Sequence, residues 1–246
     1  MPIFAKLEIC RDATPRSAAV NMAIDEALLE TAKVPSIRFY RWNSPALSFG
    51  YFGKFADVAN YAPRRDLVRR WTGGGIVFHG DDLTYSIVIP ANDPAFSESS
   101  MLIYEKIHCA LRDALAANGG GAELAAMGRD AALQRPRTAQ LAVLTNVCFA
   151  NPVRADVMVN GRKVAGAAQR RTRGGLLHQG SIQLAAGRVR VAAATGHVDL
   201  GNGLAERFAK ELSEVRNEKS LSKSLVDRAE KIAEQKYNTK NWLQGR

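Results

Sequence analysis

The chain has 246 residues, of which 46% are hydrophobic and 24% are charged, a composition typical of a soluble globular protein. No segment approaches the roughly 18 consecutive apolar residues of a membrane-spanning helix. The first residues also lack the basic-then-apolar order of a signal peptide, so a cytoplasmic location is expected. The 34 basic and 24 acidic residues give a net charge of +10, which favours an acidic partner.

The arrangement of the basic residues and of the cysteines argues against two common kinds of site. The basic residues are scattered as pairs and in a Lys-rich tail, without the aromatic platform of single-strand nucleic-acid binders. Cys10, Cys109 and Cys148 form no CxxC pair, and none has a histidine at metal-ligand spacing. We therefore expect no nucleic-acid partner, no metal site, and free thiols in a reducing compartment.

The first third of the chain predicts one helix among short strands. Residues 3–10 alternate apolar and polar side chains, which indicates an opening strand. Residues 17–33 place apolar side chains at helical spacing, and Pro35 follows as a stop. Alternation returns over residues 36–42, and another short strand is expected over 46–52.

The rest of the chain predicts further strands, a second helix and a helical tail. The further strands are expected over residues 66–70, 83–90 and 176–184. Residues 155–168 predict a hairpin with Asn160-Gly161, the favoured two-residue turn, at its tip. Apolar side chains four apart predict a helix over 100–118, and the chain from residue 204 onward is charged and helical. We see no internal repeat and no long linker, so one domain with a helical tail is expected.

Between two predicted strands lies the glycine-rich stretch Arg70-Trp71-Thr72-Gly73-Gly74-Gly75-Ile76-Val77-Phe78-His79. Consecutive glycines are costly in an ordinary strand, because they lose the most backbone entropy and pack no side chain. In return they leave the main chain open, so that a ligand can lie on it and meet its N–H groups. The alternative is a tight turn in a buried hairpin, and the triplet alone does not decide between the two.

Cys148 and Lys163 are candidates for a reactive pair. The alternative for Cys148 is an inert core thiol, because cysteine is among the most buried residue types, and a lysine just past a hairpin tip is ordinarily solvated. If the hairpin folds back, the ammonium lowers the thiol pKa from about 8.5 and stabilises an oxyanion. His79 and His178 each stand at a strand or turn edge, where the alternative to catalysis is a hydrogen-bonded structural role.

Several motifs, in order along the chain, resemble the lipoate/octanoate protein ligase and transferase family. They are Asn21–Leu28, Arg38–Trp42, Leu47–Phe52, Arg69–Gly75 with His79 and Leu83–Ser86, Gly161–Arg171, and Leu177–Ile182. Because these motifs are independent and follow in order from about residue 11 to residue 184, the resemblance is specific.

The resemblance implies an α+β fold, in which mixed β-sheets flanked by helices form an acyl pocket, as in the biotin/lipoate protein ligases. Residues 1–203 would form the catalytic domain, and residues 204–246 a helical C-terminal extension packed on it. Two chemistries share this fold. ATP-dependent ligases activate free lipoate as an adenylate, whereas octanoyltransferases take the acyl group from acyl carrier protein through a cysteine thioester.

The Cys148-Phe149 pair before the hairpin resembles the nucleophile of the transferase branch, and Lys163 matches the active-site lysine of the family. The expected function is transfer of an octanoyl group from acyl carrier protein to a lysine of a lipoyl-carrier domain, such as the glycine cleavage H protein or a dehydrogenase E2. No cofactor, metal or membrane is expected to take part. The expected substrate-binding residues are Arg70, Thr72, Gly73, Gly74, Gly75, His79, Gly166 and Ala167.

Alternatives to this function remain open on the sequence. An ATP-dependent lipoate-protein ligase would hold lipoyl-adenylate with the same residues, and the third glycine, Gly75, is closer to that branch. A lipoyl-domain to lipoyl-domain amidotransferase would use the same cysteine. The presence of both Cys148 and Lys163 disfavours a non-catalytic lipoyl-binding protein. Gly53 stands where the family usually has glutamine, and His178-Gln179-Gly180 inverts the order Gln-His-Gly.

Overall fold

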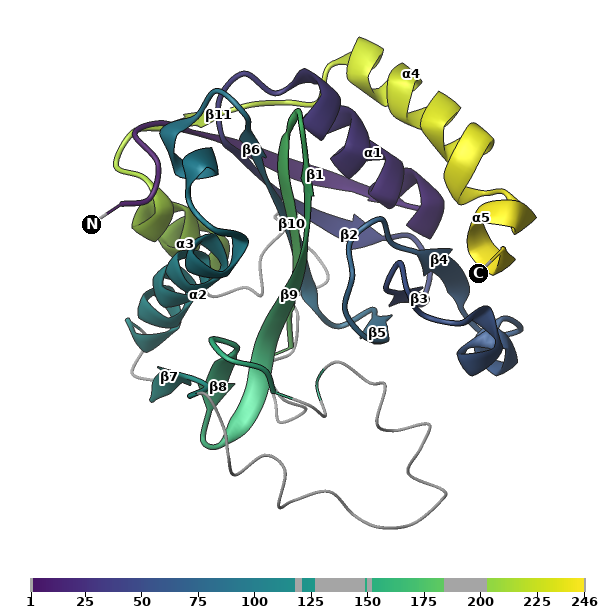
Figure 1. The fold of residues 1–246 in the computed structure, drawn as a ribbon, viewed down its shortest axis with the longest axis horizontal. Helices are drawn as coiled ribbons and strands as arrows, with labels where there is room; N and C mark the ends of the chain where they lie inside the picture. Colours follow the sequence, from purple (N-terminus) through teal and green to yellow (C-terminus); the bar gives the residue numbers. More distant parts are fainter. Residues whose placement is uncertain (1, 118–120, 127–148, 150–151, 184–202, 246) are drawn as a thin grey trace.

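Two β-sheets flanked by helices make up the computed structural model, which describes residues 2–117, 121–126, 149, 152–183 and 203–245 (Figure 1). The larger sheet has eight strands in the order β11-β1-β2-β6-β10-β9-β8-β7, and the smaller has three in the order β4-β3-β5. In the larger sheet β1 is parallel to β11 and to β2, and the other neighbours are antiparallel. The expected α+β class with mixed sheets is confirmed.

The strands are β1 (Leu7–Arg16), β2 (Ser36–Trp42), β3 (Ala46–Phe49), β4 (Asp66–Arg69), β5 (Val77–His79), β6 (Leu83–Pro90), β7 (Ala122–Leu124), β8 (Val157–Val159), β9 (Arg162–Thr172), β10 (Gly175–Ile182) and β11 (Arg216–Glu218). The α-helices are α1 (Ala18–Thr31), α2 (Ser100–Ala116), α3 (Leu204–Leu212), α4 (Lys223–Ile232) and α5 (Lys240–Gln244). A single π-helical turn, Ala233–Tyr237, joins α4 to α5. None of the helices in the described ranges has the length and apolar character that a bilayer crossing requires.

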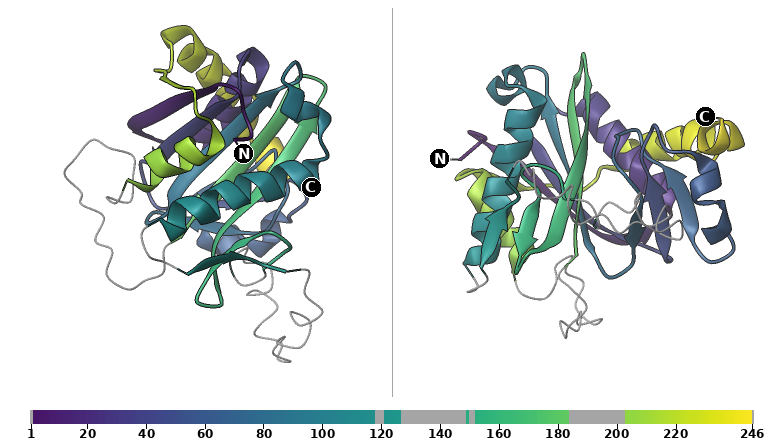
Figure 2. Two further views of the ribbon diagram at one scale, coloured as in Figure 1. Left: turned by 90° about the vertical axis from the view of Figure 1, so that its left-hand side faces the viewer. Right: turned by 60° about the horizontal axis from the view of Figure 1, so that its bottom comes forward.

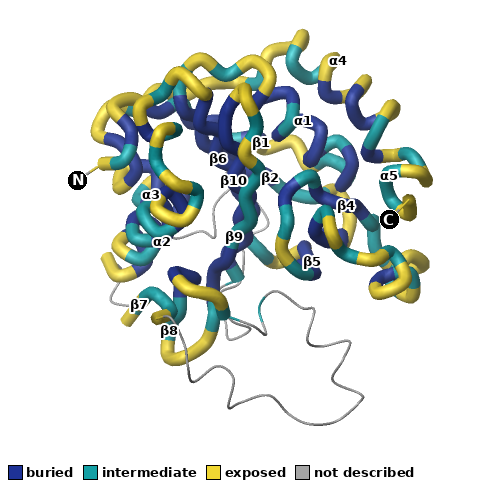
Figure 3. Tube along the Cα trace, viewed as in Figure 1, coloured by how far each residue is buried: buried dark blue, intermediate teal, exposed yellow. Residues whose placement is uncertain are grey.

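The larger sheet lies between two helical layers, with α2 and α3 on one face and α1, covered by α4, on the other (Figures 1 and 2). Phe208 of α3 meets Phe39 and Tyr85 of the sheet edge-on, with ring centroids 6.5 and 5.2 Å apart. The central strands are buried along most of their length (Figure 3). The smaller sheet stands beside α1, which contacts both β3 and β4.

Local sequence signals account for several element boundaries. The side chain of Ser17 accepts a hydrogen bond from the Val20 backbone N–H and caps α1, as expected for a helix starting there. Asn160 and Gly161 have φ values of 50° and 71°, the left-handed conformation that a type I′ hairpin turn requires. The predicted hairpin is therefore confirmed, with β8 and β9 as its strands.

Three boundaries differ from the predictions for reasons that lie elsewhere in the chain. β1 begins at residue 7, because the N–H groups of Ile3 and Phe4 donate to the carbonyl of Leu212 at the end of α3. β3 ends at Phe49, because the chain turns at Gly50 and lies against the glycine-rich stretch. The helical tail is interrupted by β11, which pairs with the exposed edge of β1.

The C-terminal segment packs on α1 and on the smaller sheet. Lys236 and Tyr237 both bond the carboxylate of Glu26 on α1, at 2.7 and 2.6 Å. The buried guanidinium of Arg69 donates to the carbonyls of Trp242 and of the residue that follows it, and the Trp242 indole donates to the Arg69 carbonyl. α3 contributes to the main core, and the division into residues 1–203 and 204–246 stays a prediction.

Candidate active site

A cavity lies between the two sheets, with about 400 Å³ of empty space when the part open to solvent is included. Its walls come from α1, from β2, β3, β5 and β6, from the glycine-rich stretch, and from β9 and β10. Among the predicted substrate-binding residues, those that line it are Arg70, Gly74, His79, Gly166 and Ala167. Side chains such as Met22, Val77 and Ala168 make much of the remaining wall apolar.

The glycine-rich stretch is not the turn of a hairpin. β4 and β5, which it connects, are separated in their sheet by β3. At Gly74 φ is +83°, a conformation that disfavours residues with a Cβ atom, and a Cβ there would lie 3.3 Å from that of Ala168. The structure therefore excludes the hairpin-turn alternative and places Gly74 in the cavity wall.

Arg70 holds the glycine-rich stretch in shape from within. Its guanidinium is buried and donates to the carbonyls of Gly73 and Gly75, at 2.9 and 2.8 Å, and to the Ser48 hydroxyl at 2.7 Å. Gly73 and Gly75 thus contribute through their carbonyls rather than as lining residues. Thr72 is fully buried, and its hydroxyl donates to the side-chain oxygen of Gln179 at 2.7 Å.

His79 is fixed on both ring nitrogens. Nδ1 donates to the Asp82 carboxylate at 2.8 Å, Nε2 lies 2.7 Å from the Ser48 hydroxyl, and the ring stacks on Trp42 at 4.1 Å. Burial opposes the charge of Asp82, but the neighbouring His79 and several hydrogen bonds lower its pKa to about 2. Ser48 and Asp82 were not among the predicted site residues, although Asp82 stands only three residues after His79.

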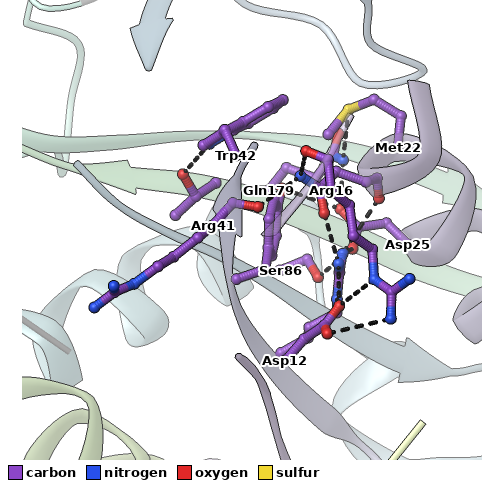
Figure 4. A network of polar contacts seen from close by, with 12 residues as sticks. Asp12, Arg16, Met22, Asp25, Arg41, Trp42, Ser86 and Gln179 are labelled. Carbon is purple, nitrogen blue, oxygen red and sulfur yellow. Dashed lines mark hydrogen bonds and ion pairs between the residues drawn. The ribbon is translucent and has the colours of Figure 1, made fainter. Parts of the chain in front are cut away.

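Gln179 ties the cavity wall to a buried ionic network under α1 (Figure 4). Its amide nitrogen donates to Asp25 at 2.7 Å, and Asp25 in turn pairs with the guanidinium of Arg38 at 2.9 Å. Arg38 also bonds Asp12 at 2.7 Å. The side-chain oxygen of Gln179 accepts a hydrogen bond from Thr72. The network is therefore linked to the glycine-rich stretch and helps to fix its position.

His178 and Gln179 lie on opposite faces of β10. Successive side chains of a strand point to opposite faces, so Gln179 faces the cavity while His178 faces the core under α2. There His178 is buried beside Tyr85 and accepts a hydrogen bond from the Gln169 amide. Burial and the nearby His108 lower the pKa of His178 well below its usual value, so this histidine is neutral and structural.

The side chain of Lys163 is buried rather than solvated. Its ammonium lies 2.7 Å from the carboxylate of Asp156, and both side chains are almost completely inaccessible to solvent. The ammonium also lies 5.7 Å from the ring centroid of Phe149, the residue that follows Cys148 in the sequence. Cys148 itself lies outside the described residues, so the pairing of its thiol with Lys163 stays a prediction.

The chain is similar in sequence to a known protein family and to several of its members. A model of the lipoyl protein ligase A/B catalytic domain matches residues 17–215. The chain belongs to this family. The octanoyltransferase LipM of Oceanobacillus iheyensis is 39% identical over 179 residues, which cover 70% of this chain and 62% of that protein. The LipM of Anoxybacillus flavithermus is 40% identical, covering 68% and 62%. The chain thus spans less than two thirds of the length of these curated relatives.

Solved structures of lipoyl protein ligases share the fold. The putative lipoate protein ligase Ta0514 from T. acidophilum with bound lipoic acid has a TM-score of 0.69 and 23% identity, with full coverage of both chains. Lipoate-protein ligase A bound with ATP has a TM-score of 0.68 and 22% identity, covering 100% of this chain and 99% of that one. The family resemblance expected from the motifs is confirmed.

In this member of the lipoyl protein ligase A/B family, Gly50 sets how closely the glycine-rich stretch approaches β3. A Cβ atom on Gly50 would lie 2.1 Å from the Gly74 carbonyl oxygen, closer than any real contact. We expect Gly50→Ala to lower the free energy of unfolding by about 1–3 kcal/mol, as overpacking does. Urea denaturation measures this. Gly121→Ala, which meets open space, is the control, and equal stability of the two variants would contradict the prediction.

Proposed function

We propose that this chain is an octanoyltransferase, which moves an octanoyl group from acyl carrier protein to a lysine of a lipoyl-carrier domain through a thioester on Cys148. The observation that carries the proposal is the buried Lys163 ammonium, held against Gly166 of the cavity wall and 5.7 Å from the ring of Phe149. The names of the LipM relatives, at 39 and 40% identity, support the octanoyl group as cargo.

The first half of the reaction would load the enzyme. The Cys148 thiolate attacks the carbonyl carbon of the donor thioester, a carbon–sulfur bond forms, and the donor thiolate leaves and takes up a proton. The Lys163 ammonium favours the thiolate of Cys148 and stabilises the oxyanion that forms on the carbonyl. The acyl chain would lie along the apolar wall formed by Met22, Val77 and Ala168.

The second half would transfer the group. The neutral amine of the acceptor lysine attacks the acyl-enzyme, loses a proton, and releases the Cys148 thiol. A thioester is exchanged for a more stable amide, so the step is favourable without ATP, and no metal is required. The +10 net charge would steer both partners to the site, because acyl carriers and lipoyl domains are typically acidic.

Intact mass after incubation with octanoyl-acyl carrier protein, without ATP, tests the proposal. We expect a single octanoyl adduct that hydroxylamine removes, because a thioester is labile to that nucleophile whereas an amide is not. Strict dependence on ATP and free lipoate, with no adduct, would contradict the transferase reaction and favour the ligase reaction.

A further inference from the structure

Both carboxylate oxygens of Asp156, the partner of Lys163, accept hydrogen bonds. One oxygen accepts from the Tyr104 hydroxyl at 2.6 Å, and the other accepts from the Val153 N–H at 2.7 Å and pairs with Lys163. The Tyr104 hydroxyl in turn accepts from the backbone N–H of Ala167, a residue of the cavity wall. The carboxylate therefore joins α2, the cavity wall and the lysine at one point.

The backbone that presents Asp156 adopts an unfavourable conformation. Ala155 has a φ of 66°, which residues with a Cβ atom rarely adopt. Its carbonyl accepts from His108 Nδ1 of α2 at 2.6 Å, and its N–H donates to the carbonyl of Ala125 at 2.9 Å. Such a conformation persists only where the surroundings fix it, so the position of the Asp156 carboxylate is tightly determined.

The ion pair also lies directly against the cavity wall. A Cβ atom on Gly166 would lie 2.5 Å from Lys163 Cε, 2.7 Å from its Nζ, and 3.2 Å from an Asp156 oxygen. Glycine at this position therefore allows the ammonium to contact the cavity wall. The ion pair with Asp156 sets the position of the ammonium along that wall.

The groups around the pair do not change charge near neutral pH. Burial lowers the pKa of His108 on α2 to about 4, and lowers that of His178 on β10 well below its usual value. Burial and the Asp156 carboxylate raise the pKa of Tyr104 on α2 and of Tyr85 on β6. In the described part of the chain, Asp156 is thus a charged partner placed directly against Lys163.

We propose that Asp156 is a positioning residue, held by Tyr104, that keeps the Lys163 ammonium both charged and in place at the cavity wall. The inference rests on the proposed function in assigning Lys163 to acyl transfer. The physical reason is that an ammonium nearly excluded from water loses its proton readily unless a carboxylate compensates it. A lysine that had lost its proton would neither favour a thiolate nor stabilise an oxyanion.

The test follows the protonation of Lys163 directly. With ¹³C-labelled lysine, the Lys163 Cε signal is assigned by its absence in Lys163→Gln and titrated with pH. Asp156→Asn keeps the size of the side chain but removes its charge. In this variant we expect Lys163 to be half deprotonated at a proton concentration at least ten times higher than in the wild type, that is, at lower pH. The pH optimum of octanoyl transfer should move in the same direction. An unchanged midpoint would overturn the proposal.

A matched variant separates this effect from a general loss of stability. Asp12→Asn removes a carboxylate from another buried ion pair, that with Arg38, and should lower stability without moving the Lys163 midpoint. An equal shift in both variants would overturn the proposal. The titration needs no octanoyl donor, so it gives its answer even if the chain transfers no octanoyl group.

If Asp156→Asn does not fold, Asp156→Glu provides the test. It retains the charge but moves it by one methylene group, so Lys163 should stay protonated while kcat for octanoyl transfer falls at least tenfold and KM for the carrier hardly changes. Wild-type transfer by Asp156→Glu would overturn the positioning role.

Discussion

Lys163→Ala is expected to slow octanoyl transfer by about 10²–10³-fold, the usual effect of removing one group that stabilises an oxyanion. It should also move the alkylation of Cys148 by iodoacetamide to higher pH, because the thiolate loses the nearby cation that favours it. Both effects follow from an ammonium that is buried at the cavity wall and oriented toward Phe149, the neighbour of Cys148. The pH profile of labelling, read by mass spectrometry, measures the coupling directly.

Two further variants control this experiment. Cys148→Ser replaces a thiol by a hydroxyl that is hardly ionised at neutral pH, so it should give no adduct and no transfer while the fold is retained. Lys163→Arg keeps the charge, but the planar guanidinium is too broad for the space between Asp156 and Gly166, so transfer should fall while the thiol stays reactive. Identical labelling profiles in the wild type and Lys163→Ala would show that Cys148 and Lys163 are not coupled.

Arg38→Gln is expected to lower the free energy of unfolding by about 3–5 kcal/mol, because it leaves buried carboxylates without their cation. The Arg38 guanidinium is 1% exposed and pairs with Asp12 and Asp25 at 2.7 and 2.9 Å. Urea denaturation of the variant and the wild type measures the size of this loss.

The control for this prediction is an ion pair at the surface. Arg228 pairs with Glu30 at 2.8 Å, but both side chains are exposed to solvent, so Arg228→Gln should leave the stability essentially unchanged. A loss in Arg38→Gln no larger than in Arg228→Gln would contradict the prediction. Because Asp25 also holds Gln179, octanoyl transfer should fall in Arg38→Gln even under conditions where the protein is folded.

Features that depend on neighbouring residues could be predicted before the fold was known. The Asn160-Gly161 turn, the start of α1 after Ser17, and the strand over 83–90 all follow from local backbone preferences, and the structure has them where they were expected. The ordered motifs also sufficed to identify the family, because family membership can be read from the order of residues without knowledge of their contacts. Lys163 and the glycine-rich stretch were singled out in the same way.

The contacts that these residues make depend on the packing of distant segments. β3 enters the smaller sheet between β4 and β5, and this placement excluded a hairpin turn at the glycines. The hydrogen bond between Gln179 and Asp25 joins residues 154 positions apart in the sequence. The carboxylate that compensates Lys163 is positioned in part by α2, because His108 of that helix donates a hydrogen bond to the Ala155 carbonyl. No local pattern encodes such contacts, because a buried charge takes its partner from whichever segment the packing of sheets and helices brings beside it.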